Sequence, residues 1–219
     1  YMNLNTIYFL HEIGGKKTQE DYIWPPAGTA SAEDKIFIIC DGVGGSENGE
    51  LASKLISEFV ASALQEIPAS TLSATVINDI LLQAQQKLID HAAQYALNTD
   101  MATTFTLLVL NDDKAFIAWC GDSRVYHIRK ESVLYKTSDH SLVNTLVKKG
   151  EITEQEARSH RQKNIILKAI KADYSPIEAE ANWITNIEDG DYFMLCTDGL
   201  LENISDNELT FLLRQENTN

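Results

Sequence analysis

Thr103 to Cys120 reads TTFTLLVLNDDKAFIAWC, two runs of apolar and β-branched residues on either side of Asn-Asp-Asp. Such runs favour β-strands, and the polar residues 111–113 are typical of a tight turn between them. Two strands joined by so short a turn must run antiparallel. Further strand-like runs follow at 125–128 and 133–135, so the pattern predicts that this hairpin continues into an antiparallel meander.

Segments with the spacing of amphipathic helices flank the strand region. Residues 50–65 and 76–97 repeat apolar side chains every three or four positions. Two capping boxes, in which Thr or Ser is followed three residues later by Glu, predict helices at 153–160 and 205–214. This order of elements predicts an α+β fold, an antiparallel sheet arrangement with helices packed outside it.

The totals restrict the class of protein. A chain of 219 residues with no internal linker favours a single domain spanning 1–219. The formal net charge of -14 argues against nucleic acid or an anionic membrane as a partner. The three cysteines end apolar runs and show no CxxC spacing, which favours reduced, buried thiols in a cytoplasmic protein. We recognise no signal peptide and no apolar stretch long enough to span a bilayer.

Three apolar runs end in cysteine and are followed within two residues by an aspartate beside a glycine. They are Ile36 to Gly42, Ala115 to Asp122 and Tyr192 to Gly199. A strand that ends at such a pair presents carboxylate and backbone carbonyl oxygens together. Several such ends at one rim would make an oxygen-rich site, which is what hard divalent cations such as Mg²⁺ and Mn²⁺ prefer.

Each of these motifs also has a purely structural interpretation. Asp41 to Gly45 can be a tight strand-to-helix turn, and Asp198 can be a helix N-cap. Gly121 to Arg124 can be a bulge with a structural Asp–Arg pair, although the planar guanidinium of Arg124 would also suit a bound carboxylate or phosphate.

The segment Gly14 to Asp21 places two lysines before Glu20 and Asp21. It can serve a cation and an anion side by side, or it can be an exposed charged loop.

Other chemistries find less support. Asp206 follows the Ser205 cap, where the helix dipole favours an acidic residue, so we assign it no metal. The five histidines show no ligand spacing, which disfavours zinc. No GxSxG motif indicates a serine nucleophile.

The order of the motifs makes them specific, and the chain resembles the metal-dependent serine/threonine protein phosphatases of type 2C (the PPM family) in their compact bacterial form. The resemblance runs from about Gly14 to Glu208 and includes a flap-like segment at 150–160. It rests on Glu20-Asp21, Asp41-Gly42-Val43-Gly44-Gly45, Met101-Ala102-Thr103-Thr104, Gly121-Asp122-Ser123-Arg124, Asp139-His140-Ser141-Leu142-Val143 and Thr197-Asp198-Gly199-Leu200.

This resemblance implies a four-layer αββα sandwich, two antiparallel sheets face to face with helices outside. It also implies two Mn²⁺ or Mg²⁺ ions between the sheets, with a third, weaker ion in bacterial members. The implied metal set is Asp41 as the bridging ligand, the Gly42 carbonyl, Asp198, Asp21 through water, Glu20 in support of that water, and Asp122 for the third ion.

The implied reaction is hydrolysis of phosphoserine or phosphothreonine in proteins by a hydroxide shared between two metals, without a phospho-enzyme. Asp41 and Asp198 would be the catalytic ligands. Lys16 stands where the family usually has an arginine that grips the phosphate, so it would supply charge but not a bidentate fork. The implied partner is a phosphoprotein, for which a serine/threonine kinase is one candidate.

Ala102 stands where the family usually has a glycine, a smaller departure that could crowd a turn. Two other departures leave an alternative open: Lys16 replaces the usual arginine, and no residue supplies the metal-binding Asp-Asn pair that opens the family's last strand. We therefore expect that strand to be absent and the domain to be truncated at its C-terminus. The alternative is a pseudophosphatase, a phosphoprotein-binding module with weak or no catalysis.

Overall fold

The computed structural model describes residues 6–15, 18–43, 48–97, 99–201 and 204–216. Its strands form a five-stranded sheet in the order β1-β2-β4-β5-β9, a three-stranded sheet in the order β10-β6-β7, and the small pair β3-β8. All the pairings within these sheets are antiparallel. The strands are β1 (Asp21–Trp24), β2 (Ile36–Asp41), β3 (Ala102–Thr103), β4 (Phe105–Asn111), β5 (Lys114–Cys120), β6 (Arg124–Arg129), β7 (Ser132–Lys136), β8 (Ile170–Lys171), β9 (Glu180–Ile184) and β10 (Tyr192–Cys196).

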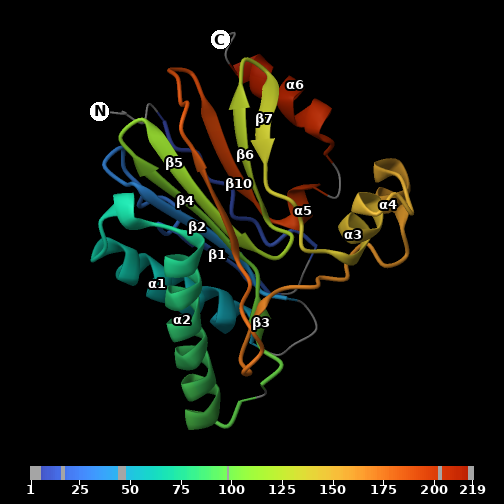
Figure 1. Ribbon diagram of the computed structural model, residues 1–219. Helices are drawn as coiled ribbons and strands as arrows, with labels where there is room; N and C mark the ends of the chain where they lie inside the picture. The colour runs from blue at the N-terminus through green and yellow to red at the C-terminus, as the bar shows by residue number, and fades with distance from the viewer. Residues whose placement is uncertain (1–5, 16–17, 44–47, 98, 202–203, 217–219) are drawn as a thin grey trace.

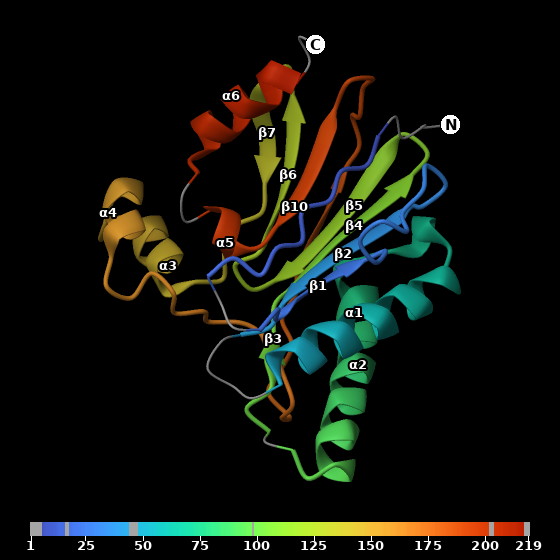
Figure 2. The ribbon, with the colours of Figure 1, turned by 180° about the vertical axis from the view of Figure 1, so that it is seen from behind.

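The helices lie outside the two larger sheets (Figure 1). The long helices α1 and α2 cover the outer face of the five-stranded sheet, and α6 covers the outer face of the three-stranded sheet, as the view from behind also shows (Figure 2). The short helices α3 and α4 lie to one side. The helices are α1 (Gly49–Gln65), α2 (Ala74–Gln94), α3 (Leu142–Lys148), α4 (Glu154–Ser159), α5 (Asp198–Leu201) and α6 (Asp206–Glu216), with one 3-10 turn at Ala69–Thr71.

Alternation along β4 explains the layers. Leu107 and Val109 join the apolar cluster shared with α1 and α2, whereas Leu108 and Leu110 join the cluster shared with the three-stranded sheet. Both faces of the strand are therefore buried, which is why its sequence is a continuous apolar run. A third cluster, including Leu209 of α6, lies on the far face of the three-stranded sheet. These three apolar interfaces confirm the α+β class and the expected αββα order.

The expected meander is wrong at one point. β4 pairs with β5, and β6 pairs with β7, but β5 and β6 belong to different sheets. The link 121–123 carries the chain across, and Gly121 lies there at a φ of 119°, in a region that disfavours side chains. A short connection therefore changes sheets here instead of forming a hairpin.

Both capping boxes are confirmed. Thr153 and Glu156 exchange side-chain and backbone hydrogen bonds at the start of α4. Ser205 and Glu208 do the same before α6. Within the described residues, no helix combines the length and the apolar character needed to cross a membrane.

Candidate metal centre

Asp21 and Asp41 face each other at the open end of β1 and β2. They are direct cross-strand partners in the antiparallel register. Their neighbours Tyr22 and Cys40 point to the helix layer, because the Tyr22 hydroxyl donates to Glu58 of α1 at 2.8 Å and Cys40 is buried in the helix-side core. Side chains alternate along a strand, so both aspartates face the other sheet.

The backbone beside this pair is closely packed. Gly42 donates its N–H to the Glu20 carbonyl at 3.0 Å, which brings Glu20 to the same turn. A Cβ on Gly42 would lie 2.5 Å from backbone atoms of Gly49, in the first turn of α1. Only glycine allows helix and turn to approach this closely. Glu20, Asp21, Asp41 and Gly42 thus lie together, an arrangement that the resemblance implied.

Asp198 approaches the same rim from the other sheet. It opens α5 just after β10, and the hydroxyl of the preceding Thr197 donates to Asp21 Oδ2 at 3.3 Å. The sequence also allowed Asp198 as a helix N-cap, but it is the first residue within α5. A carboxylate in this first turn can still face the rim.

Asp122 lies near Asp198. Its side chain belongs to the link between β5 and β6, where the residue is only 7% exposed. Burial raises the pKa of the Asp122 carboxyl to about 7, and the negative charges of Asp198 and Asp139 add to this rise. A carboxylate held among other carboxylates is the electrostatic setting that a bound cation would relieve.

Arg124 does not serve as a phosphate fork. Its guanidinium makes a bidentate contact with Asp139 at 2.6 Å for both bonds, and its Nη1 donates to the Tyr126 hydroxyl at 2.9 Å. The sequence suggested Asp122 as a structural partner for Arg124. The structure pairs it with Asp139 instead, which comes from the segment after β7.

The carboxylate oxygens of this rim suit hard divalent cations, and the carboxylates come in two pairs. Asp21 lies with Asp41, and Asp122 lies with Asp198. Among the residues that the structure describes, no group of three or more His, Cys, Asp or Glu side chains is arranged to hold one ion. Magnesium-like ions often take only one or two protein carboxylates and complete their shell with water, so the pairs are chemically suitable.

Some predicted residues fall elsewhere. Lys16, Gly44 and Gly45 lie outside the described residues. Asp206 is in the first turn of α6, where it accepts from Tyr126 at 3.1 Å and pairs with Lys136 at 2.7 Å. Its exclusion from the metal set agrees with these contacts.

Sequence reasoning assigned no role to Thr103, Thr104, Ser123 or Thr197, although all four are next to the aspartates. Thr103, Thr104 and Ser123 are almost fully buried. One feature of the sequence could have identified these residues: they are polar residues at the ends of apolar strand runs. Polar side chains are buried at such places only when they find hydrogen-bond partners.

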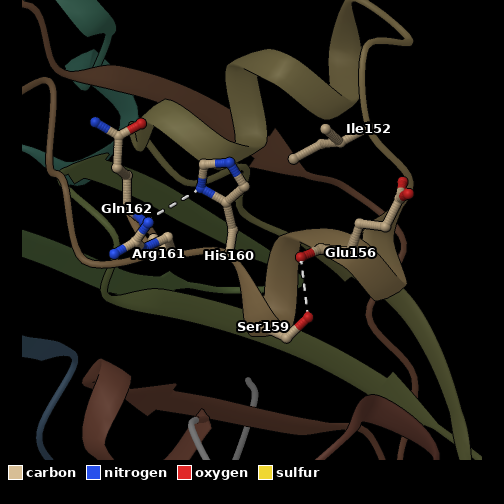
Figure 3. Close-up of a pocket in the computed structure, with 6 residues that line it drawn as sticks. All are labelled: Ile152, Glu156, Ser159, His160, Arg161 and Gln162. Carbon is tan, nitrogen blue, oxygen red and sulfur yellow. Dashed lines mark hydrogen bonds between the residues drawn. The ribbon is translucent and has the colours of Figure 1, made fainter.

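Hollows on the part of the surface that the structure describes include two that bear on the predicted segments. One is lined by His11, Gln19, Asp21, Tyr22, Asn48, Glu50, Leu51 and Lys54, so it opens beside Asp21. The other lies on the flap-like segment and is lined by Ile152, Glu156, Ser159, His160, Arg161 and Gln162. There the Ser159 hydroxyl donates to the Glu156 carbonyl at 3.4 Å and the Gln162 N–H donates to His160 Nδ1 at 3.2 Å (Figure 3). None of the aspartates at the rim lines this second pocket, so it is separate from the candidate metal centre.

Comparison with known proteins gives a consistent result. A family model described as Protein phosphatase 2C matches residues 11–216. The chain is 33% identical over 210 residues to Protein phosphatase PhpP of Streptococcus pneumoniae, covering 93% of this chain and 82% of that protein.

Solved structures agree. Serine/threonine phosphatase Stp1 from Staphylococcus aureus is similar with a TM-score of 0.81 and 30% identity, covering 97% of this chain and 85% of that one. The catalytic domain of serine threonine protein phosphatase PstP, in complex with 2 manganese ions, shares the fold at a TM-score of 0.74 and 24% identity, covering 91% and 79% of the two chains.

Proposed function

We propose that this chain, which belongs to the protein phosphatase 2C family, hydrolyses phosphoserine and phosphothreonine in proteins with the help of divalent cations. The named relatives support an active phosphatase rather than a binding module that has lost catalysis. Enzymes of this family are metal-dependent, and the relative in complex with 2 manganese ions supports two Mn²⁺ ions as cofactors. Mg²⁺ in their place and a third ion at Asp122 are proposed from the resemblance alone.

The observation that carries the proposal is the meeting of aspartates from both sheets at one rim. Asp21 and Asp41 come from the five-stranded sheet, and Asp198 and Asp122 come from beside the three-stranded sheet. When bound there, divalent cations acidify water and offset the negative charge of a phosphoryl group.

The chain's own residues then have separable roles. Asp41 and the Gly42 carbonyl would hold the cations at the end of β2, with Asp21 and Glu20 in support. Asp198 and Asp122 would complete the site from the other sheet. Because Arg124 is occupied by Asp139, Lys16 is the residue that we propose to contact the substrate phosphate.

Charge explains why the cations are needed. The chain has a net charge of -14, and the rim gathers carboxylates. A phosphate dianion approaching this rim without cations would be repelled. The cations therefore serve binding as well as chemistry.

The three cysteines are free and buried. Burial raises the pKa of the Cys120 and Cys196 thiols to about 12, which keeps them protonated and unreactive. Free thiols of this kind support the cytoplasm as the location. The substrates would be phosphoproteins, and a serine/threonine kinase is one candidate.

Release of phosphate from a phosphothreonine peptide tests the proposal. We expect turnover with Mn²⁺, none with excess EDTA, and a fall of about 100-fold or more in Asp41→Asn, because that change weakens the charge that holds the cations. Asp112→Asn is the matched control. Asp112 is exposed in the β4–β5 turn at a φ of 50°, a conformation that asparagine also adopts readily.

Equal turnover with and without EDTA would contradict the metal-dependent mechanism. A wild-type protein that binds manganese but releases no phosphate from any phosphopeptide would favour the binding module instead.

A further inference from the structure

Thr104 lies at the junction of β3 and β4 and is 1% exposed. Its Oγ1 accepts the N–H of Asp41 at 3.0 Å, and its own N–H donates to the Asp41 carbonyl at 2.8 Å. The neighbouring Thr103 hydroxyl donates to the same carbonyl at 3.0 Å. The peptide groups on both sides of Asp41 are therefore fixed by this pair of threonines.

The same side chain also reaches the turn that carries Asp122. Thr104 Oγ1 lies 2.8 Å from the hydroxyl of Ser123, which follows Asp122 and is 2% exposed. At the start of that turn, a Cβ on Gly121 would lie 2.7 Å from Thr104 Cβ. Thr104 thus contacts the residue before Asp122 and the residue after it.

We propose that Thr104 is a positioning residue that couples the turn of Asp41 to the turn of Asp122, so that both carboxylates are held ready for cations. This rests on the proposed function. The hydroxyl is the coupling element, because it accepts the backbone N–H beside Asp41 and hydrogen-bonds with Ser123 at once.

The physical reason lies in burial. Replacing the hydroxyl by a methyl group leaves the buried Asp41 N–H facing an apolar group, so we expect the turn to shift toward another acceptor. Groups that orient metal ligands from behind typically contribute 10- to 100-fold to metal affinity.

Thr106 provides a matched control two residues further along β4. It is fully buried, and its hydroxyl makes no hydrogen bond to any residue that the structure describes. Thr106→Val makes the same chemical change as Thr104→Val in the same strand region, but without a partner to lose.

The test is titration calorimetry with Mn²⁺ on the wild-type chain, Thr104→Val, Thr104→Ser, Ser123→Ala and Thr106→Val. We expect Thr104→Val to weaken manganese binding by about 10- to 100-fold. Thr104→Ser should restore binding to within about threefold of wild type, because it keeps the hydroxyl. Ser123→Ala should weaken binding less than Thr104→Val, because Asp41 keeps its acceptor, and Thr106→Val should bind as the wild type does.

Turnover gives a second readout. With the phosphothreonine peptide, the manganese concentration for half-maximal rate should rise in Thr104→Val, while the rate at saturating manganese stays close to wild type. If Thr104 had a purely structural role, Thr104→Val would lower the unfolding midpoint but would change neither the calorimetric manganese affinity nor the manganese concentration for half-maximal rate.

Wild-type manganese affinity in both Thr104→Val and Ser123→Ala overturns the proposal. If Thr104→Val does not fold, Ser123→Ala decides alone: weaker manganese binding supports the coupling, and unchanged binding overturns it. A wild-type chain that neither binds manganese nor releases phosphate would overturn the proposed function itself, so the two failures are distinguishable.

Discussion

Asp198 lies close enough to Asp122 for its negative charge to help raise the pKa of the Asp122 carboxyl. Burial contributes most to the rise, Asp198 and Asp139 add to it, and the pKa of Asp122 reaches about 7. Two aspartates that are far apart in the sequence therefore share one electrostatic environment between the sheets. In the metal-free protein, this repulsion lies where we propose that cations bind.

This relationship predicts how the metal-free protein responds to pH. The folded state keeps the Asp122 proton up to about pH 7, whereas the unfolded chain releases it near pH 4. Raising the pH across this window therefore lowers stability. In EDTA, Asp122→Asn should be more stable than wild type at pH 8 by about 2–4 kcal/mol, with a much smaller difference at pH 5.

Urea unfolding at the two pH values measures this difference. The exposed Asp112→Asn variant should show the wild-type pH dependence. A wild-type protein whose stability is flat between pH 5 and pH 8 would contradict the prediction.

Gly121 should not tolerate a side chain. It adopts a φ of 119°, and a Cβ there would lie 2.7 Å from Thr104 Cβ. Gly121→Ala should destabilise the protein by about 3 kcal/mol or more, since backbone strain and a buried clash add together. Gly190→Ala is the control, because Gly190 has a φ of 86° with nothing within 4 Å of the added Cβ.

Gly190→Ala should cost only about 1 kcal/mol, from the backbone strain alone. Chemical denaturation compares the two variants. Equal losses would show that close packing against Thr104 does not matter.

The Tyr126 hydroxyl joins α6 to the three-stranded sheet. It accepts from Arg124 at 2.9 Å and donates to Asp206 at 3.1 Å. Tyr126→Phe should lower stability by about 1–2 kcal/mol, because the half-buried side chains of Arg124 and Asp206 each lose a hydrogen bond. Hydrogen exchange should quicken in α6 more than in α1.

Tyr174→Phe, at a residue that is 79% exposed, should leave both quantities unchanged. Uniform acceleration of exchange over the whole chain in Tyr126→Phe would argue against a local anchoring role.

Asp191 stabilises the end of the three-stranded sheet that carries Arg129 and the start of β10. Burial by itself would raise the pKa of the Asp191 carboxyl. Hydrogen bonds from Arg129 at 2.7 and 2.8 Å, from the Glu188 N–H and from His127 outweigh the effect of burial, so the pKa falls well below its usual range. A carboxyl with a lowered pKa gives stability above about pH 4, and this stability is lost as the pH falls further.

Asp191→Asn should therefore cost about 1–3 kcal/mol at pH 7 and progressively less below pH 4. Unfolding measured from pH 7 down to pH 2 follows this convergence, with the exposed neighbour Asp189→Asn as control. Parallel curves for Asp191→Asn and wild type would contradict the assignment.

Local sequence patterns predict much of the secondary structure. The apolar runs of β2, β4, β5 and β10, the helical spacing of α1 and α2, and both capping boxes appear where the sequence predicts them. These signals are local because strand and helix periodicity depends on neighbouring residues. The resemblance to the type 2C phosphatases is also confirmed by the family match over residues 11–216.

The sequence named candidate residues for the site but not their contacts. The motifs identified Asp21, Asp41, Asp122 and Asp198, and the structure places Asp21 opposite Asp41 and Asp122 near Asp198. Their role as metal ligands stays a prediction. The sequence allowed Arg124 to fix a carboxylate, and it does, but the sequence did not show that this carboxylate belongs to Asp139, which follows β7.

The sequence by itself determined the type of each main element and the position of an aspartate at the strand ends, because both follow from residue type and spacing. Only the tertiary structure decided that β6 leaves the sheet of β5, and that Thr104 stands between the turns of Asp41 and Asp122. Sheet membership depends on which apolar faces bury one another across the whole chain. A buried hydroxyl acquires its partners only once those faces have packed.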